Sequence, residues 1–364
     1  MRYKEFVRVF EDYVNTQKPL REYRSIKQAQ QQIIKTLSGL QADNQEHAKI
    51  LDKIYKIINT DNIGGKMDQA LIPPQTDEKL AEPAKQKIRQ DITQLISNLD
   101  SNYANINKLL KRLKAGGIVD IKQLAQPINS FSNVFGDELG AQLFTAMSNY
   151  GVGIKQKGPG EFGFAMLSNQ IQLADGEGDL QMKGIGKVEL KAARGSAGGR
   201  IGYGGMSQQQ KRQVLDKYAQ QIPITIKNIN PAGSLGIVPF LQALYQDTGN
   251  NPKLRQTIIK ELIGPDLGKF ANPVVTAAKG MDVGKVLDTY IVQNFEWYRA
   301  RDNFDALLLV SFPNKKTAMI RNAKDILALK QSGHISSTSI SAIPTKAGAG
   351  REQWAQLSLT KAGI

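Results

Sequence analysis

Residues 158–202 read GPGEFGFAMLSNQIQLADGEGDLQMKGIGKVELKAARGSAGGRIG, a glycine-rich stretch in which strand-like patterns begin. Apolar and polar residues alternate from Asp179 to Met182 and again from Lys187 to Ala192, as they do in strands that bury one face. Gly184 and Gly186 lie between the two runs and suit a tight connection. The pattern predicts a β-hairpin.

The second expected strand carries charged residues on one face. Strand alternation sends Val188 and Leu190 toward the core and puts Glu189 and Lys191 together on the opposite face. Asp179 precedes Glu189 by ten residues, a length that lets the hairpin bring their carboxylates side by side. Two neighbouring carboxylates suit Mg²⁺, which prefers hard oxygen ligands and keeps waters that can act as nucleophiles. Lys191 could orient or deprotonate such a water.

Further acidic residues lie close to this hairpin in the sequence. Glu161 stands between a Gly-Pro-Gly sequence and an apolar run, so we expect it to begin a helix against the sheet, where it could complete the metal site. Asp175 and Glu177 are rivals to Asp179. Both lie in a glycine turn, whereas Asp179 opens a strand-like run, and we therefore favour Asp179.

An Asp followed by Glu-x-Lys on two strands, after a helix-borne Glu, resembles the PD-(D/E)XK nuclease superfamily. Gly178-Asp179 stands where the family has Pro-Asp, so the proline is missing, and Glu189-Leu190-Lys191 matches the Glu-x-Lys element. The resemblance implies binding of Mg²⁺, with Mn²⁺ able to substitute, by Asp179, Glu189 and the Leu190 backbone carbonyl. It also implies that Lys191 assists the attacking water. Glu161 matches an acidic residue on the family's first core helix, as a catalytic residue and a further metal ligand.

The same resemblance implies a fold. The family core runs helix, three-stranded meander, helix and further strands, and the apolar run from Phe304 to Phe312 would supply the fourth strand. We therefore expect an α/β (α+β) protein: a restriction-endonuclease-like mixed sheet flanked by helices, with a helical N-terminal region and a helical insertion. The resemblance covers residues 158–202 well, residues 304–325 weakly and the N-terminal third not at all.

Periodicity and breakers divide the chain into four parts. Apolar residues at three- and four-residue spacing predict helices near 6–14, 50–58 and 88–99 in a first region, 1–117, for assembly or for DNA or partner binding. Residues 118–206 would form the first part of the nuclease core, 207–300 a helical insertion and 301–364 the second part. Further helices are expected at 137–150, 208–221, 239–246, 254–263 and 283–298, and further strands at 317–321 and 354–360.

The chain carries 48 basic and 33 acidic residues, a formal net charge of +15, which favours a polyanionic partner such as DNA. Between Lys183 and Lys217 there are eight basic residues against two acidic ones. The expected nucleic-acid contacts lie in this stretch: Lys183, Lys187, Arg194, Arg200 and Tyr203. The glycine-rich segment 194–205 could cradle a phosphate or form a mobile loop. Trp297 and Tyr298 could stack on bases or belong to the core.

Composition excludes several kinds of site. There are no cysteines, which excludes disulfides, zinc-thiolate sites and thiol nucleophiles, and the two histidines, His47 and His334, are far apart. The sequence does not fit the G-x-x-x-x-G-K-[ST] phosphate loop. Early charged residues interrupt any signal-peptide core, and a run of about 18 apolar residues occurs nowhere. We therefore expect no membrane partner and a cytoplasmic location, or a virion if the gene belongs to a phage.

The leading hypothesis is a Mg²⁺-dependent hydrolase that cuts DNA phosphodiester bonds as an endonuclease. The alternative is a DNA-binding structural or packaging protein, such as a phage virion component, that keeps a nuclease-like fold for binding. The long helical N-terminal region motivates this alternative and could also build a homodimer or a larger assembly. A further alternative leaves Glu189 and Lys191 as a solvated pair on an edge strand without a catalytic role.

Overall fold

The computed structural model describes residues 45–60, 66, 82–99, 102–150, 160–174, 176–193, 199–201, 206–229, 234–235, 237–338, 343–344 and 355–361. These residues belong to two compact units, Met1–Leu110 and Lys111–Ile364. The helix expected near residues 6–14 lies outside the described residues. Among the described helices, none is both long and apolar enough to cross a bilayer.

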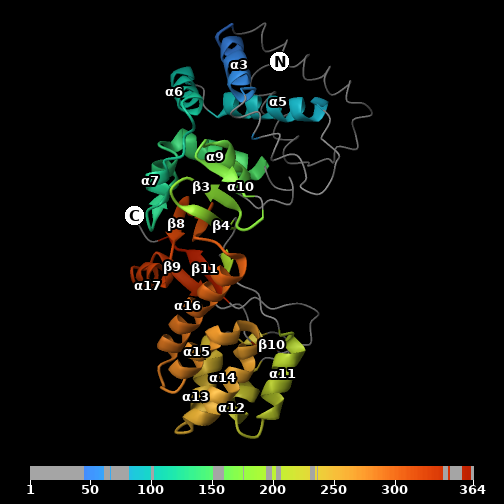
Figure 1. The fold of residues 1–364 in the computed structure, drawn as a ribbon, viewed down its shortest axis with the longest axis vertical. Coiled ribbons are helices and arrows are strands. Elements are labelled where there is room, and N and C mark those ends of the chain that lie inside the picture. The colour runs from blue at the N-terminus through green and yellow to red at the C-terminus, as the bar shows by residue number, and fades with distance from the viewer. Residues whose placement is uncertain are drawn as a thin grey trace. The chain divides into compact units, whose positions relative to one another are not determined.

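The first unit contains α3 (Gln45–Ile58), α5 (Glu82–Asn98) and the start of α6 (Tyr103–Lys114), as Figure 1 shows. The apolar residues expected on one face of α3 are buried, and this helix packs against α5. Tyr55 of α3 donates a hydrogen bond to the Gln86 side chain of α5 at 2.5 Å. The amphipathic period therefore decides which face of α3 is covered.

A six-stranded sheet forms part of the second unit, in the order β1-β8-β7-β4-β3-β2. Its strands are β1 (Asn129–Ser130), β2 (Ile171–Leu173), β3 (Leu180–Met182), β4 (Gly186–Ala193), β7 (Ala306–Ser311) and β8 (Lys316–Ile320). The expected hairpin is present as β3 and β4, and its turn contains Gly184 at a φ of 77°. All neighbouring strands are antiparallel except β4 and β7. The protein therefore belongs to the α+β class, with a mixed sheet.

Strand β7 is buried along its whole length. No residue from Ala306 to Val310 is more than 2 % exposed, which is typical of a strand covered on both faces. It lies parallel to β4, with Val188 opposite Ala306 and Ala193 opposite Ser311. Parallel neighbours need a long crossover connection, and the helices between β4 and β7 supply it. The strand expected near residues 304–312 is therefore present, in the interior of the sheet.

Short helices and aromatic side chains pack beside the sheet: α7 (Ile121–Leu124), α8 (Phe131–Val134), α9 (Glu138–Tyr150) and α10 (Glu161–Met166). Phe144 of α9 stacks on Phe135 and Phe312, with ring centroids 4.2 and 5.6 Å apart. Helix α10 packs against α9 and β2. Gly163 permits this close approach, because a Cβ atom there would lie only 2.8 Å from the Ser148 hydroxyl.

Most of residues 208–302 is helical, as expected of the insertion: α11 (Gln208–Lys217), α12 (Pro223–Asn228), α13 (Ile237–Thr248), α14 (Pro252–Leu267), the 3-10 helix η3 (Gly268–Phe270), α15 (Ala271–Ala277) and α16 (Val283–Asp302). Their buried side chains share one core with apolar residues of β7 and β8. The helical block is therefore packed against the sheet through that common core.

The C-terminal part forms further strands around α17 (Ala323–Gln331). A separate three-stranded sheet has the order β5-β11-β9, formed by β5 (Gly199–Ile201), β11 (Ala355–Leu359) and β9 (Ile335–Thr338). A short pair joins β6 (Ser234–Leu235) to β10 (Ile343–Pro344). The strand expected at 354–360 is thus present as β11, but it lies outside the six-stranded sheet.

A buried arginine ties the helical block together. Arg255 of α14 is 1 % exposed, and its guanidinium lies 4.6 Å from the ring centroid of Tyr245. It donates hydrogen bonds to oxygen atoms at the ends of α13 and α15: those of Thr248, Gly249, Ala278 and Lys279. The last carbonyls of a helix lack partners within that helix, and this single side chain satisfies several of them.

We expect Arg255→Ala to lower the free energy of unfolding by at least about 3 kcal/mol, because it leaves several buried acceptors without their donor. Urea denaturation of the full chain measures this loss. Lys253→Ala is the matched control, since Lys253 lies in the same helix and is exposed. Equal unfolding free energies for the two variants would contradict the assigned role of Arg255.

Candidate functional site

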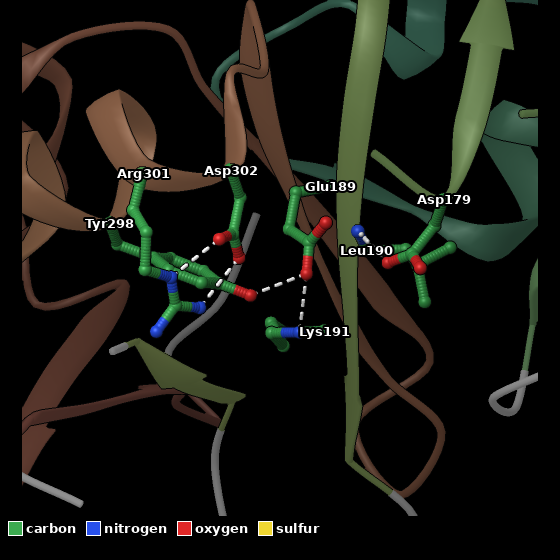
Figure 2. A network of polar contacts seen from close by, with 7 residues as sticks. All are labelled: Asp179, Glu189, Leu190, Lys191, Tyr298, Arg301 and Asp302. Atoms are coloured by element: carbon green, nitrogen blue, oxygen red, sulfur yellow. Dashed lines mark hydrogen bonds and ion pairs between the residues drawn. The ribbon is translucent and has the colours of Figure 1, made fainter. Parts of the chain in front are cut away.

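Asp179 lies immediately before β3, beside the middle of β4. Gly178 turns the chain at a φ of 73°, and the Asp179 amide then donates to the Val188 carbonyl at 3.0 Å. The Asp179 carboxylate accepts the Leu190 N–H through Oδ2 at 2.8 Å (Figure 2). Beyond the end of β3, the Asp179 side chain thus takes the place of a strand partner for β4. Its carboxylate lies next to the peptide that joins Glu189 to Leu190.

The Leu190 backbone carbonyl points to the same edge of β4. Within a strand, the N–H and C=O of one residue are directed to the same side. Because the Leu190 N–H faces Asp179, its carbonyl is also directed to the edge that β3 leaves uncovered. The Leu190 side chain is buried at 4 % exposure. The structure therefore brings together two of the oxygen donors expected from the sequence.

Glu189 is buried, and it has one partner on its own strand and one from a distant part of the chain. Its side chain is 9 % exposed, and Oε1 accepts a hydrogen bond from Lys191 Nζ at 2.6 Å. The same oxygen accepts a hydrogen bond from the Tyr298 hydroxyl. Strand β4 lies between β3 and β7, so Glu189 and Lys191 are not a solvated pair on an edge strand.

Tyr298 contacts Glu189 and Lys191, and the sequence did not predict this contact. The residue is 2 % exposed, near the end of α16, and its ring packs edge-on against Phe304 with centroids 5.3 Å apart. Burial raises the pKa of Tyr298 far above its usual value, and the negative charge of Glu189 raises it further. The phenol therefore keeps its proton at any ordinary pH and is a hydrogen-bond donor to Glu189.

A second charged pair flanks Tyr298. The Arg301 guanidinium lies 5.0 Å from the ring centroid of Tyr298 and 4.8 Å from that of Trp297. It also pairs with the Asp302 carboxylate through two contacts of 2.5 and 2.7 Å. Lys191 Nζ lies 5.4 Å from the Tyr298 centroid. Figure 2 shows the carboxylates of Asp302 and Glu189 on the same side of the Arg301–Tyr298 contact, and Asp179 across β4 from them.

The segment that follows α16 is joined to β4 by two hydrogen bonds of Asp305, one from its backbone and one to its side chain. Asp305 donates its N–H to the Lys187 carbonyl at 2.8 Å and accepts the Lys187 N–H through Oδ2 at the same distance. Gly186 leaves room for this contact, because a Cβ atom there would lie 2.1 Å from Asp305 Oδ2. These bonds hold the chain that leaves α16 against the strand that carries Glu189.

Glu177, a rival to Asp179 in the sequence, has a different place. Its carboxylate accepts hydrogen bonds from Lys187 Nζ and from the Asn303 side chain. The hydrogen bond from Lys187 is the main reason that the pKa of Glu177 is lowered. Glu177 therefore joins the hairpin to the end of α16 at the surface, whereas Asp179 contacts the backbone of β4. Asp175 lies outside the described residues.

The remaining candidates are distributed as follows. Glu161 begins α10, as expected, and is 5 % exposed. Within the described ranges, no three Asp, Glu or His side chains gather as a metal-binding group, so Glu161 does not join Asp179 and Glu189 in one cluster. Lys183 is exposed in the hairpin turn. Arg194 and Tyr203 lie outside the described residues, and for Arg200 only the backbone, in β5, is described.

Helical periodicity could indicate that Tyr298 is buried but not what it contacts. Tyr290, Ile291, Phe295 and Tyr298 share the buried face of α16 at helical spacing. The partner, Glu189, is 109 residues away in the sequence, and no local pattern connects the two.

Comparisons with protein-family models, with curated proteins and with solved structures find no match for this chain. The function is therefore inferred from the residues of the site.

We expect a double-mutant cycle on Tyr298 and Glu189 to give a coupling of about 1.5 to 3 kcal/mol in the free energy of unfolding, the range for a buried hydrogen bond to a charged group. Tyr298→Phe should destabilise the wild-type chain. The same change should cost little in a Glu189→Ala background, where the phenol has already lost its acceptor. Urea unfolding at pH 7 of the four proteins measures the coupling, and additive effects would contradict the contact.

Proposed function

We propose that the protein is a Mg²⁺-dependent endonuclease that hydrolyses DNA phosphodiester bonds, with Mn²⁺ able to replace Mg²⁺. One observation carries the proposal: the Asp179 carboxylate is bonded to the Leu190 N–H, on the strand whose face holds Glu189 and Lys191. Asp179, Glu189 and the Leu190 carbonyl would bind the metal. Lys191 would orient or deprotonate the attacking water.

The donor set suits Mg²⁺ in chemical type. Two carboxylates and a backbone carbonyl are hard oxygen ligands, and Mg²⁺ is commonly bound through one or two carboxylates together with waters and substrate phosphate. The absence of a three-carboxylate group among the described residues leaves this smaller set as the proposed one. Glu161 would then act as a neighbour of the site, through α10, and not as a ligand.

The order of elements supports the fold that this function implies. Helix α10 precedes the antiparallel meander β2-β3-β4, and α16 then leads into β7, which lies parallel to β4. This is the helix, meander, helix and strand order of the PD-(D/E)XK core. We propose on this basis that the mixed sheet is of the restriction-endonuclease-like type.

The residues of β4 have distinct tasks in the proposed reaction. A bound Mg²⁺ would polarise the phosphate and acidify a water. Lys191 Nζ is within hydrogen-bond distance of Glu189, and its side chain is 26 % exposed, so it can reach both the buried carboxylate and a bound phosphodiester. It can orient the attacking water and offset negative charge that develops on the phosphate. The oxygen of that water bonds to phosphorus while the bond to the leaving oxygen breaks.

We expect Lys191→Met to slow nicking of supercoiled plasmid by about 10²- to 10⁴-fold, because the change removes the cation but keeps the apolar stem. Asp179→Asn should slow it at least as much, since the amide oxygen can still accept the Leu190 N–H but the ligand charge is gone. Single-turnover nicking with Mg²⁺, Mn²⁺ or EDTA measures both effects.

Glu177→Gln is the matched control for these variants, because Glu177 is a carboxylate of the same hairpin that contacts Lys187 and Asn303. It should retain most of the wild-type rate. Undiminished nicking by Asp179→Asn or by Lys191→Met, or nicking that persists in EDTA, would refute the proposal.

The second candidate is a DNA-binding structural or packaging protein, with assembly through the N-terminal helices and a place in a phage virion. One observation favours it: Glu189 and Asp179 are both bonded to groups of the protein itself. Under this proposal the net charge of +15 would serve binding alone.

For either candidate we expect the protein to bind duplex DNA in EDTA, with log K falling linearly as log salt concentration rises, by about 0.9 per phosphate contacted. Fluorescence anisotropy between low and physiological salt measures the slope. Tight binding without nicking in any divalent metal would favour the structural protein. Binding that does not depend on salt would count against both candidates.

A further inference from the structure

We infer that Tyr298 is a positioning residue for the proposed metal site: its hydroxyl orients the Glu189 carboxylate so that one oxygen is held by the protein and the other is presented to the metal. The inference rests on the proposed function. It assigns a task to a residue of the helical insertion that the Asp and Glu-x-Lys pattern does not include.

The hydrogen bonds to Glu189 are asymmetric. Tyr298 Oη and Lys191 Nζ both donate to the same carboxylate oxygen, Oε1. A carboxylate held through one oxygen by two donors from different directions has a restricted side-chain rotation. In Figure 2 the second oxygen of Glu189 points toward the side of β4 on which Leu190 N and Asp179 lie. That is the side where the Asp179 carboxylate and the Leu190 carbonyl would supply the other ligands.

Tyr298 can act as a fixed donor because its own position is restricted on several sides. Tyr298 is 2 % exposed, and its ring packs edge-on against Phe304 and lies under the Arg301 guanidinium. The segment that follows its helix is hydrogen-bonded to β4 through Asp305 and Lys187. The donor and the acceptor are therefore mounted on two elements that are joined to each other.

Residues that hydrogen-bond to a metal ligand, without touching the metal themselves, affect how tightly the metal is bound. Groups that hydrogen-bond to a ligand set its orientation, and their removal typically lowers metal affinity or activity by about 10- to 100-fold. A purely structural tyrosine, which only fills space and satisfies Glu189, would change stability but not the affinity of the folded protein for metal. Metal binding in the absence of DNA separates the two roles.

The experiment is a titration of the full chain with Mn²⁺, followed by electron paramagnetic resonance of the free ion, for wild type, Tyr298→Phe and Tyr245→Phe. Tyr245 is the matched control because it is a buried tyrosine of α13 whose hydroxyl makes no hydrogen bond among the described residues. We expect Tyr298→Phe to weaken Mn²⁺ binding about 10-fold or more, and Tyr245→Phe to leave it unchanged. In nicking assays Tyr298→Phe should need more Mg²⁺ for half-maximal rate, with an unchanged KM for DNA.

Phe304→Leu provides a second variant if Tyr298→Phe does not fold, because it loosens the ring without altering the hydroxyl. It should weaken Mn²⁺ binding in the same direction by a smaller factor. Wild-type affinity in the folded Tyr298→Phe protein, or an equal loss in Tyr245→Phe, would overturn the inference and leave the proposed nuclease intact. A wild-type chain that neither binds Mn²⁺ nor nicks DNA would overturn the proposed function, and the inference with it.

Discussion

The parallel pairing of β4 with β7 is the contact on which the rest of the second unit depends. It joins residues 188–193 to residues 306–311, so the helical block between them must leave the sheet and return to it. Strand β7 is buried on both faces, and its apolar side chains share a core with that block. Burial of this strand is a large favourable term in the free energy of folding. The same pairing brings the end of α16 against the strand that carries Glu189.

Glu189 places a carboxylate inside the protein, where a charge is energetically unfavourable. A buried carboxylate is unfavourable unless it is paired and hydrogen-bonded. Lys191 supplies the opposite charge, and Tyr298 supplies a neutral donor. These contacts make the buried charge tolerable in the folded chain. A metal ion at the proposed site would also compensate this charge.

Several elements could be predicted from short stretches of sequence. The β3–β4 hairpin follows from alternation and glycines within a dozen or so residues, and β7 follows from a continuous apolar run. Strand β11 was expected, but its membership of a second sheet was not, because alternation says which residues are buried and not which strand is the neighbour. Arg255 is buried in the folded chain. Only the ends of α13 and α15, which meet it in the folded chain, explain its burial.

By itself, the sequence determined the positive charge, the exclusion of thiol chemistry, the hairpin and the common face of Glu189 and Lys191, since each is a property of composition or of strand period. The tertiary structure decided that Glu189 is buried, that Asp179 is bonded to Leu190, and that Tyr298 donates a hydrogen bond to Glu189. The physical reason is that these contacts join segments separated by up to 109 residues. Their meeting depends on strand pairing and on burial of a shared core, which no local pattern encodes.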